Sequence, residues 1–486
     1  MKEKSLKKNY ILYLIKTVSS LLFPMITFVY TTHVLSVEGI GKVDFSRSVV
    51  SYFTLFASLG VTSYGIREGA KVKGDQEKLS RLVKELFTIN ICTSIFTYII
   101  FFLSLIFIEK FQEYKFLLAV SGLGIGCSAL GLEWLYSALE EYECMTVRTV
   151  ICQIISLILL FLFVRDADDY NFYAAILVLS TAGGNIFNIV HARKYISLTF
   201  SDRMELKKHI KPIFVFFTNA AAGNIYVTLD TSMTGLLSSD YAVGLYAAAN
   251  KMNRICLSVI VSLSVILLPR LSYYLSIGKM DKYKDLLKKC FECALALAIP
   301  AASGMFLLSG EILPVFSGTG YIPATLCSKI MSVIIILIPL STIAANQILI
   351  PYGKEKYQLY ATLAGTVTNI TANFLLIPRY AQTGAAVGTV FAEFMVTAHA
   401  LYFSAKCINY RFVLKNIWHY ILSSCLMLSC IWMLKFIVTA PAVRCIVIPA
   451  AGAAVYGLGL ALLKDSLFLE VSSQMKNMIL RLSKQM

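Results

Sequence analysis

Apolar segments of about twenty residues follow one another along almost the whole chain, with only short polar turns between them. A helix needs about 20 apolar residues to cross the hydrocarbon core of a bilayer. No water satisfies the backbone in that core, so each segment that crosses it has to be helical. Only 15% of the residues are charged, against about 25% in a soluble domain. The sequence therefore predicts an all-α membrane protein.

The hydropathy pattern predicts about fourteen transmembrane helices, two of which are weakly marked. The segments 116–138 and 171–190 are rich in small or polar residues, so their apolar character is less continuous. The predicted spans are 9–34, 44–66, 84–107, 116–138, 146–164, 171–190, 210–236, 243–268, 289–309, 322–349, 356–378, 384–404, 416–438 and 442–463.

Lysine and arginine residues are distributed unevenly between the predicted loops. With the N-terminus placed inside, the inner segments hold 31 of the 44 Lys and Arg residues, the outer loops hold 7 and the spans hold 6. Cytoplasmic loops carry such an excess of positive charge, so we expect both termini in the cytoplasm. The net charge of +16 is spread over these loops and forms no single patch, which argues against nucleic acid as a partner.

Two short segments of the chain resemble each other. LSVEGIGKVDF at Leu35–Phe45 and LSSDYAVGLYAAA at Leu237–Ala249 are 202 residues apart at their leucines and 203 apart at Gly41/Gly244. Six predicted spans lie in each unit, so both units enter the membrane from the same side, as in a parallel repeat with substrate sites between the halves. The predicted domains are a six-helix bundle at 1–205, a second bundle at 206–405, and two additional helices with a cytoplasmic tail at 406–486.

Longer motifs occur in a fixed order along the chain. They are YGIREGAK at Tyr64–Lys71, GLEWLYSALEEYE at Gly131–Glu143, NAAAGNIYVTLDTSMTGLLS at Asn219–Ser238 and TNITANFLLIPRYAQTGAAVGTVFAE at Thr368–Glu393. In this order and at these spacings the chain resembles the polysaccharide repeat-unit flippases of O-antigen, capsule or exopolysaccharide synthesis. These form the Wzx-type branch of the multidrug/oligosaccharidyl-lipid/polysaccharide (MOP) exporter superfamily. The resemblance covers residues 1 to about 405.

The resemblance implies a fold, a substrate and a set of partners. The fold would be MATE-like, with two six-helix bundles around a central cavity and two C-terminal helices. The substrate would be an oligosaccharide on undecaprenyl diphosphate, moved across the bacterial plasma membrane by alternating access. Membrane lipids, H⁺ or Na⁺ as a coupling ion, and the polysaccharide polymerase machinery would be the other partners.

Basic residues inside the predicted spans are the first candidates for substrate binding. A charge at the bilayer centre costs roughly 2.5–3.5 kcal/mol on insertion scales, so such residues usually face a wet cavity or a partner. Lys251 and Arg254 are three residues apart and share one helical face, and two cations on one face suit a diphosphate. Pairing with acidic neighbours is the alternative interpretation. Further candidates, for which snorkelling to an interface is also open, are Lys16, Arg47 and Lys329.

Acidic and amide residues inside the spans are candidates for ion coupling and for a polar cavity. Asp230 could be the site at which H⁺ or Na⁺ binds, or it could form a static ion pair with Lys251. Glu393 could also be an ion site, or it could form a structural hydrogen bond. Asn219 and Asn224 could contact sugar, or they could bond between helices, which is the usual role of amides in membranes.

Two charged residues near the predicted inner interface are expected to form an ion pair. Arg148 begins the fifth predicted span, and Glu133 lies close to the end of the fourth. Both would then lie at the same depth in the membrane.

Three other functions remain open from the sequence. A flippase for the peptidoglycan lipid precursor and a multidrug or cation exporter would belong to the same superfamily. A membrane-embedded polymerase or ligase of lipid-linked sugars would need catalytic residues on a substantial outer loop, and the sequence has no such loop. No catalytic motif, metal-ligand cluster or cofactor motif stands out, so we expect a transporter without metal or cofactor.

Overall fold

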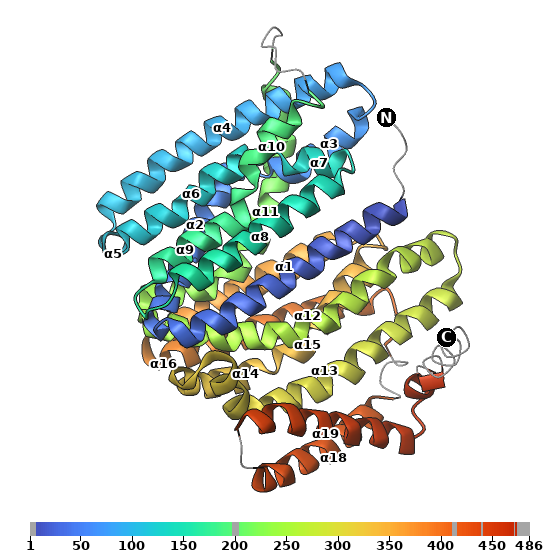
Figure 1. The fold of residues 1–486 in the computed structure, drawn as a ribbon. Helices are drawn as coiled ribbons and strands as arrows, with labels where there is room; N and C mark the ends of the chain where they lie inside the picture. The colour runs from blue at the N-terminus through green and yellow to red at the C-terminus, as the bar shows by residue number, and fades with distance from the viewer. Residues whose placement is uncertain (1–5, 197–203, 411–415, 439–440, 471, 474–486) are drawn as a thin grey trace, which may run out of the picture. The chain divides into compact units, whose positions relative to one another are not determined.

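The protein folds as two compact units of helices, which are described separately. Every element that the structure describes is a helix (Figure 1), which confirms the prediction of an all-α membrane fold. Unit 1 is Met1–Gly244 and unit 2 is Leu245–Met486. The structure is a computed structural model and describes residues 6–196, 204–410, 416–438, 441–470 and 472–473.

The helices follow one another with short connections in both units. Unit 1 contains α1 (Leu6–Val34), α2 (Val37–Ser58), α3 (Val61–Val72), α4 (Gln76–Phe107), α5 (Glu109–Glu113), α6 (Lys115–Leu130), α7 (Glu133–Ala138), α8 (Tyr142–Phe163), α9 (Tyr170–Val178), the π-helical η1 (Leu179–Gly183), α10 (Asn185–Ala192), α11 (Lys207–Leu237) and the start of α12 (Asp240–Ser276). Unit 2 continues with α13 (Met280–Ser317), the 3-10 helix η2 (Thr319–Ala324), α14 (Thr325–Met331), α15 (Ile334–Thr342), the π-helical η3 (Ile343–Leu349), α16 (Lys356–Ala405), α18 (Ile417–Ile437) and α19 (Pro441–Leu462).

Within the described residues, nine helices are long and apolar enough to cross a membrane, and ten if the bent pair Thr319–Met331 and Ile334–Leu349 is one span. One of them, α16, has 50 residues. A straight helix of that length would extend about 75 Å, more than twice the roughly 30 Å of a hydrocarbon core. The backbone breaks at Ala381, where φ is 47° and ψ is −127°, so α16 consists of two helices joined end to end. The count of fourteen spans remains a prediction.

The two weakly marked spans form interrupted helices. The segment 116–138 is divided between α6 and α7, and the segment 171–190 between α9, η1 and α10. In the second case the hydroxyls of Ser180 and Thr181 both donate to the carbonyl oxygen of Leu177, at 2.8 Å each. Such bonds from a side chain to its own helix compete with the regular backbone pattern, which accounts for a π-helical turn at this place.

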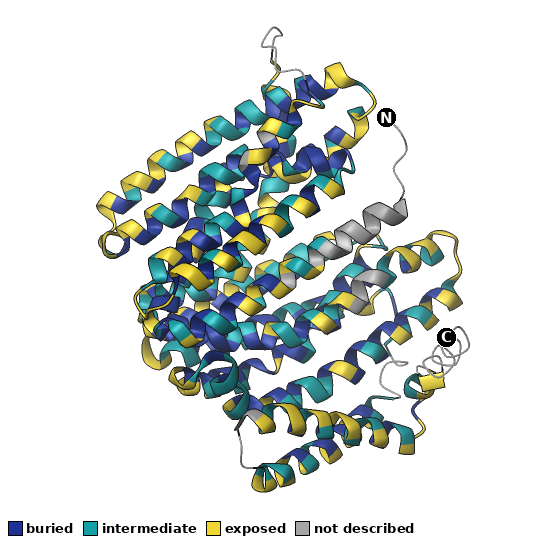
Figure 2. Cartoon of the chain, viewed as in Figure 1, coloured by how far each residue is buried: buried dark blue, intermediate teal, exposed yellow. Residues whose placement is uncertain are grey.

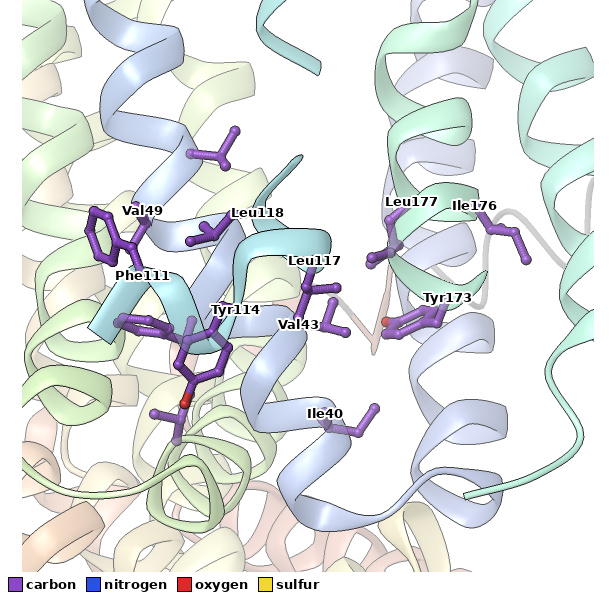
Figure 3. Close-up of a cluster of buried hydrophobic side chains, with 14 of the residues drawn as sticks. Ile40, Val43, Val49, Phe111, Tyr114, Leu117, Leu118, Tyr173, Ile176 and Leu177 are labelled. Carbon is purple, nitrogen blue, oxygen red and sulfur yellow. The ribbon is translucent and has the colours of Figure 1, made fainter. Parts of the chain in front are cut away.

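The core of unit 1 lies where α2 packs against α4, α6 and α9. Ile40 and Val43 of α2 meet Leu117 of α6 and Tyr173 of α9 within one cluster of buried apolar side chains (Figure 3). Tyr114, just before α6, joins the cluster and donates its hydroxyl to the carboxylate of Asp240 at 2.6 and 2.7 Å. This core packs against one face of α2 and therefore fixes the direction of its polar face.

Helix α11 packs against α2 and α3 and so belongs to unit 1 by its contacts. A Cβ atom on Gly235 would come within 2.2 Å of the Phe45 ring, and the Tyr52 hydroxyl lies 2.7 Å from Ser232 Oγ. The predicted domain boundary at 205/206 lies just before the start of α11 at Lys207. This boundary separates the two sequence repeats, and it remains a prediction.

The two repeat motifs begin their helices in the same way. Ser36 Oγ accepts from the backbone N–H of Gly39 at the start of α2, and Ser239 Oγ accepts from that of Ala242 at the start of α12, at 3.1 and 3.3 Å. Serine is a favoured capping residue at this position. Ser36 and Ser239 are 203 residues apart, and so are Gly39 and Ala242. The two capped helix starts therefore correspond at a spacing of 203 residues. The spacing of 202 at the leucines in the sequence comparison is therefore off by one residue.

Large apolar side chains are exposed along the outer faces of several helices. On α4, Phe96 and Phe107 are 65% and 80% exposed, and exposed residues mark α4, α18 and α19 in Figure 2. Such faces are stable in contact with lipid chains and not with water. In unit 2, α18 is joined to α13 by the ion pair of Lys435 with Glu311, at 2.8 Å.

Candidate functional site

A cavity of about 450 Å³ lies inside unit 1, between α2, α6, α9 with η1, and α11. One wall is the polar face of α2, which carries Arg47, Ser51, Thr54 and Ser58. These residues recur at intervals of three or four positions and therefore share one helical face. Helix α11 contributes Asn224, so the helix that opens the second sequence repeat also lines this cavity.

Hydroxyl groups make the α2 wall a surface of hydrogen-bond acceptors. Ser51, Thr54 and Ser58 each donate to a carbonyl oxygen of α2 three or four residues earlier, at 2.7, 2.9 and 3.0 Å. A hydroxyl has one hydrogen to donate and two lone pairs to accept. Because each hydrogen is used within the helix, the lone pairs remain available to a ligand with donor groups.

Two further polar atoms of the cavity are buried without a protein partner. Ser121 Oγ on α6 and Asn224 Oδ1 on α11 have no hydrogen bond from any part of the chain that the structure describes. Such an atom is rare in a native fold and costs about 1–3 kcal/mol. Both residues line the cavity, so these atoms are suited to hydrogen-bonding a ligand there.

Arg47 is the charged residue of the cavity lining. The Arg47 side chain is 45% exposed, and its guanidinium lies 3.7 Å from the carboxylate of Asp44, which is too long for a hydrogen bond. A guanidinium has five N–H donors in a planar fork that matches phosphate and carboxylate groups. The cavity therefore combines one cation with several hydroxyl groups and one amide, and the rest of its lining is apolar.

The other basic candidates lie outside this cavity. Lys16 on α1 is half-buried, as are Lys251 on α12 and Lys329 on α14. Arg254 is exposed, and its Nε donates to Asn250 Oδ1 at 3.0 Å, one turn earlier on α12. The sequence pattern places Lys251 and Arg254 on one face of α12, whereas a common site for all five cations remains a prediction.

Both acidic candidates are buried within helices. Asp230 on α11 is 5% exposed and Glu393 on α16 is 6% exposed. The backbone carbonyl of Asp230 accepts from the Thr234 hydroxyl at 2.7 Å. The expected pair of Asp230 with Lys251 would join residues of different units and remains a prediction. The side chain of Asn219, the remaining candidate, lies outside the described part of the chain.

The expected ion pair near the start of α8 is confirmed. Arg148 Nη2 lies 2.7 Å from Glu133 Oε1, and the Arg148 side chain is only 10% exposed. The pair joins the start of α7 to the first half of α8, so it connects the second part of the interrupted segment to the next helix.

Sequence reasoning missed the hydroxyls of the cavity. Arg47 and Asn224 are among the candidates from the sequence, whereas no serine or threonine is. A usable signal was present, because positions 47, 51, 54 and 58 form a polar stripe at helical spacing in an apolar span. Ser121 on α6 carries no such signal, because only the packing of α6 against α2 brings it to the same cavity.

Comparison with known proteins identifies relatives for most of the chain. A family model described as polysaccharide biosynthesis protein matches residues 6–275, and one described as MatE matches residues 215–375. The putative O-antigen transporter of Shigella dysenteriae is 23% identical over 404 residues, covering 82% of this chain and 99% of that protein. The capsular polysaccharide biosynthesis protein CapF of Staphylococcus aureus is 21% identical over 375 residues, covering 75% and 91%.

Solved structures share the fold at lower sequence identity. The lipid II flippase MurJ in an inward closed conformation matches 94% of this chain and 99% of its own, with a TM-score of 0.77 and 15% identity. An inward-facing MATE family multidrug resistance transporter of the MOP superfamily matches 82% and 98%, with a TM-score of 0.63 and 11% identity. These likenesses confirm the MATE-like fold.

Proposed function

The chain belongs to the polysaccharide biosynthesis protein family, in the Wzx-type branch of the MOP superfamily, and from this premise we propose that it is a flippase for lipid-linked precursors. It is a transporter and not an enzyme. Its substrate is an oligosaccharide repeat unit on undecaprenyl diphosphate, which it carries from the inner to the outer face of the bacterial plasma membrane by alternating access. The names of the O-antigen and capsule relatives support a polysaccharide substrate.

The cavity of unit 1 is the single observation that carries this proposal. At about 450 Å³ its volume lies in the range of ligand pockets, roughly 300–1,000 Å³. Hydroxyl and amide groups complement the hydroxyls of a sugar, and the Arg47 guanidinium complements a phosphate group. A site for cationic drugs would require the opposite charge.

The repeat relates the cavity to the cationic face of α12. At the structural register of 203 residues, Arg47 corresponds to Asn250 and Ser51 corresponds to Arg254. Each repeat therefore places one arginine and one neutral polar residue, four positions apart, on the equivalent helix. This correspondence supports Arg254 as the second group that binds the diphosphate. Lys251, three residues earlier on α12, and Lys16 and Lys329 are proposed as further contacts.

The same proposal assigns ion coupling, topology and partners. Asp230 and Glu393 are the sites where H⁺ or Na⁺ couples transport to a gradient, because buried acidic residues in membrane helices are usually functional. Asn219 and Asn224 are polar contacts of the substrate.

The proposal also includes the topology of the chain. The repeat units are 1–205 and 206–405, followed by the additional segment 406–486, and both termini are cytoplasmic. The polymerase machinery would act on the product at the outer face.

Flipping can be measured with the purified full-length protein in liposomes. The probe is a fluorescent undecaprenyl-diphosphate oligosaccharide, and an impermeant reductant quenches the label on the outer leaflet. We expect the protein to accelerate quenching beyond the outer-leaflet fraction. Arg47→Gln should slow flipping about tenfold or more, since a charged hydrogen bond contributes about 1.5–3 kcal/mol. Arg165→Gln, at an exposed position in the connection between α8 and α9, is the matched control and should leave the rate unchanged.

Other outcomes would assign another function. A rate equal to that of protein-free liposomes would reject the flippase proposal for this substrate. Acceleration of a labelled peptidoglycan lipid precursor, without acceleration of the oligosaccharide lipid, would favour the peptidoglycan flippase. Transport of a cationic dye alone would favour a drug exporter, and elongation of the oligosaccharide would favour a polymerase.

A further inference from the structure

Three buried polar side chains from three helices of unit 1 form a chain of hydrogen bonds. Tyr64 on α3, Glu85 on α4 and His209 in the first turn of α11 are 5%, 1% and 3% exposed. The Tyr64 hydroxyl lies 2.8 Å from His209 Nδ1, and His209 Nε2 lies 2.8 Å from Glu85 Oε2. The three residues are distant in sequence, so the network exists only because α3, α4 and the start of α11 meet here.

Glu85 is surrounded by groups that donate to its carboxylate. The backbone N–H of Glu205 donates to Oε1 at 2.8 Å. Lys208 Nζ lies 3.2 Å from Oε2, and Arg81 Nε lies 3.4 Å from Oε1. Together with His209, four donors converge on two oxygens, and the ionised carboxylate is the form that accepts from all of them. Glu85 is therefore the counter-ion of the network.

His209 can bind or release a proton while keeping both hydrogen bonds. In the neutral ring, Nε2–H donates to Glu85 and Nδ1 accepts from the Tyr64 hydroxyl. In the protonated ring, Nδ1–H donates instead, and the Tyr64 oxygen accepts, because a phenol can do either. Imidazole is the side chain whose charge ordinarily changes near neutral pH.

The network is buried but only one contact from solvent. Three residues that contact the Glu85 carboxylate are partly exposed: Lys208, Arg81 and Glu205 have exposed fractions of 46%, 41% and 62%. Glu205 also forms ion pairs with Arg81 and with Lys208. On α3 the further charged groups are Arg67, whose guanidinium lies 5.5 Å from the Tyr64 ring centre, and Glu68, which pairs with it at 2.8 Å. Protons can therefore reach His209 through a polar surface patch.

The apolar side of the network is formed by the packed core of α3, α4 and α11. Leu82 and Leu86 of α4 and Ile213 of α11 belong to the same buried cluster as Tyr64. In such a dry setting the strength of the bond between His209 and Glu85 depends strongly on charge, because a charge-assisted hydrogen bond is roughly twice as strong as a neutral one.

We propose that Tyr64, Glu85 and His209 form a proton-binding latch, which fastens the start of α11 to α3 and α4 more tightly when His209 is protonated. Falling pH charges the imidazole and strengthens its bond to the Glu85 carboxylate, and rising pH weakens it. Because α11 also carries Asn224 into the cavity, the latch adjusts the helix that contacts the substrate. This effect on transport rests on the proposed function, whereas the proton site itself does not.

Deuterium exchange at the imidazole C2 position tests the proton site directly. The full-length protein in lipid nanodiscs would be followed by mass spectrometry between about pH 5 and pH 9, which brackets ordinary histidine titration. We expect His209 to show a titration curve, and Glu85→Gln to lower its proton affinity about tenfold or more. His399, whose Nδ1 lies 2.9 Å from the Met395 carbonyl oxygen, is the control. Its exchange profile should be the same in the wild type and in Glu85→Gln.

Backbone amide exchange of residues 207–218 tests the latch. The exchange rates are first corrected for the intrinsic pH dependence of amide exchange. We then expect these amides to exchange on the order of tenfold more slowly at about pH 6 than at about pH 8. A tenfold change is what results when the closed state of the latch binds the proton about tenfold more tightly than the open state. His209→Gln keeps a donor for Glu85 and an acceptor for Tyr64 but stays neutral, so its protection should match the high-pH state throughout. His399→Gln is the matched control and should behave as the wild type.

The proposal is overturned if His209 shows no titration in this range, or if His209→Gln retains the pH dependence of α11. Both measurements are made without substrate, so a failed flipping assay would leave them unaffected. Conversely, a flippase with normal activity and an α11 that is insensitive to pH would reject the latch alone.

Discussion

Gly41 of α2 and Gly244 of α12 pack against each other's helix in a reciprocal way. A Cβ atom on Gly41 would lie 1.9 Å from the carbonyl oxygen of Asp240, and one on Gly244 would lie 2.2 Å from that of Val37. Gly41 and Gly244 are 203 residues apart, and so are Val37 and Asp240. The contact is therefore self-complementary, as at an interface related by a two-fold axis, and it joins the two sequence repeats through their most similar motifs.

Adding a methyl group at either glycine should destabilise the protein. Overpacking typically costs about 1–3 kcal/mol, and here the obstacle is a backbone carbonyl, which cannot rotate away. We expect Gly41→Ala and Gly244→Ala to lower the thermal unfolding midpoint of the detergent-solubilised protein. Gly223→Ala on α11, where a Cβ would meet nothing within 4 Å, is the control and should be neutral or stabilising. Equal midpoints for all three variants would contradict the close approach of α2 and α12.

Ser121 should separate stability from transport. Its hydroxyl has no protein partner among the described residues, and removing such a group is nearly neutral or stabilising. We expect Ser121→Ala to keep or raise the unfolding midpoint while slowing flipping about threefold to tenfold, since one ligand hydrogen bond contributes about 0.5–1.5 kcal/mol. Ser156→Ala on α8, which removes a donor to the Ile176 carbonyl, should lower stability. Loss of stability without loss of flipping in Ser121→Ala would place the substrate elsewhere.

A glycine at position 381 should stabilise the break in α16. The Ala381 backbone has φ 47° and ψ −127°, a conformation that costs a residue with a Cβ of order 1–3 kcal/mol. We expect Ala381→Gly to raise the unfolding midpoint. Ala398→Gly, an exposed position of the same helix, should lower it, because glycine costs about 1 kcal/mol relative to alanine in a helix interior. If both variants changed the unfolding midpoint in the same direction, Ala381 would not be strained.

Neutralising Glu133 should destabilise the junction of α7 and α8. The Arg148 side chain is 10% exposed, so loss of Glu133 leaves a largely buried guanidinium without its charged partner and with only the hydrogen bond from Nη1 to Asn188 Oδ1. We expect a cost of roughly 1–3 kcal/mol. Glu140→Gln is the control, because its pair with Lys73 is about half exposed on both sides, and exposed pairs contribute about 0–1 kcal/mol. Equal losses of stability in the two variants, measured by thermal unfolding, would rule out a special role for the pair of Arg148 with Glu133.

Much of the architecture can be predicted from the sequence before any packing between helices is known. Apolar length and the distribution of Lys and Arg predict membrane helices and their direction, because a helix satisfies its own backbone and each span is a local property. The repeat at Gly41 and Gly244 is also visible as a motif. The weak segments 116–138 and 171–190 were recognised as weak for a physical reason, since their small and hydroxyl residues permit the interruptions that the structure has.

The candidate site shows where such reasoning stops. Arg47 and Asn224 could be selected from the sequence because a charge or an amide in an apolar span is costly alone. Ser121, Glu85 and His209 could not be assigned, because their surroundings come from helices far away in the chain. The sequence by itself determined the helices, since hydropathy and backbone hydrogen bonding act within each segment. Only the tertiary structure decided which polar faces meet, because that depends on close contacts, such as those of Gly41 and Gly244, between segments that have no local signal for each other.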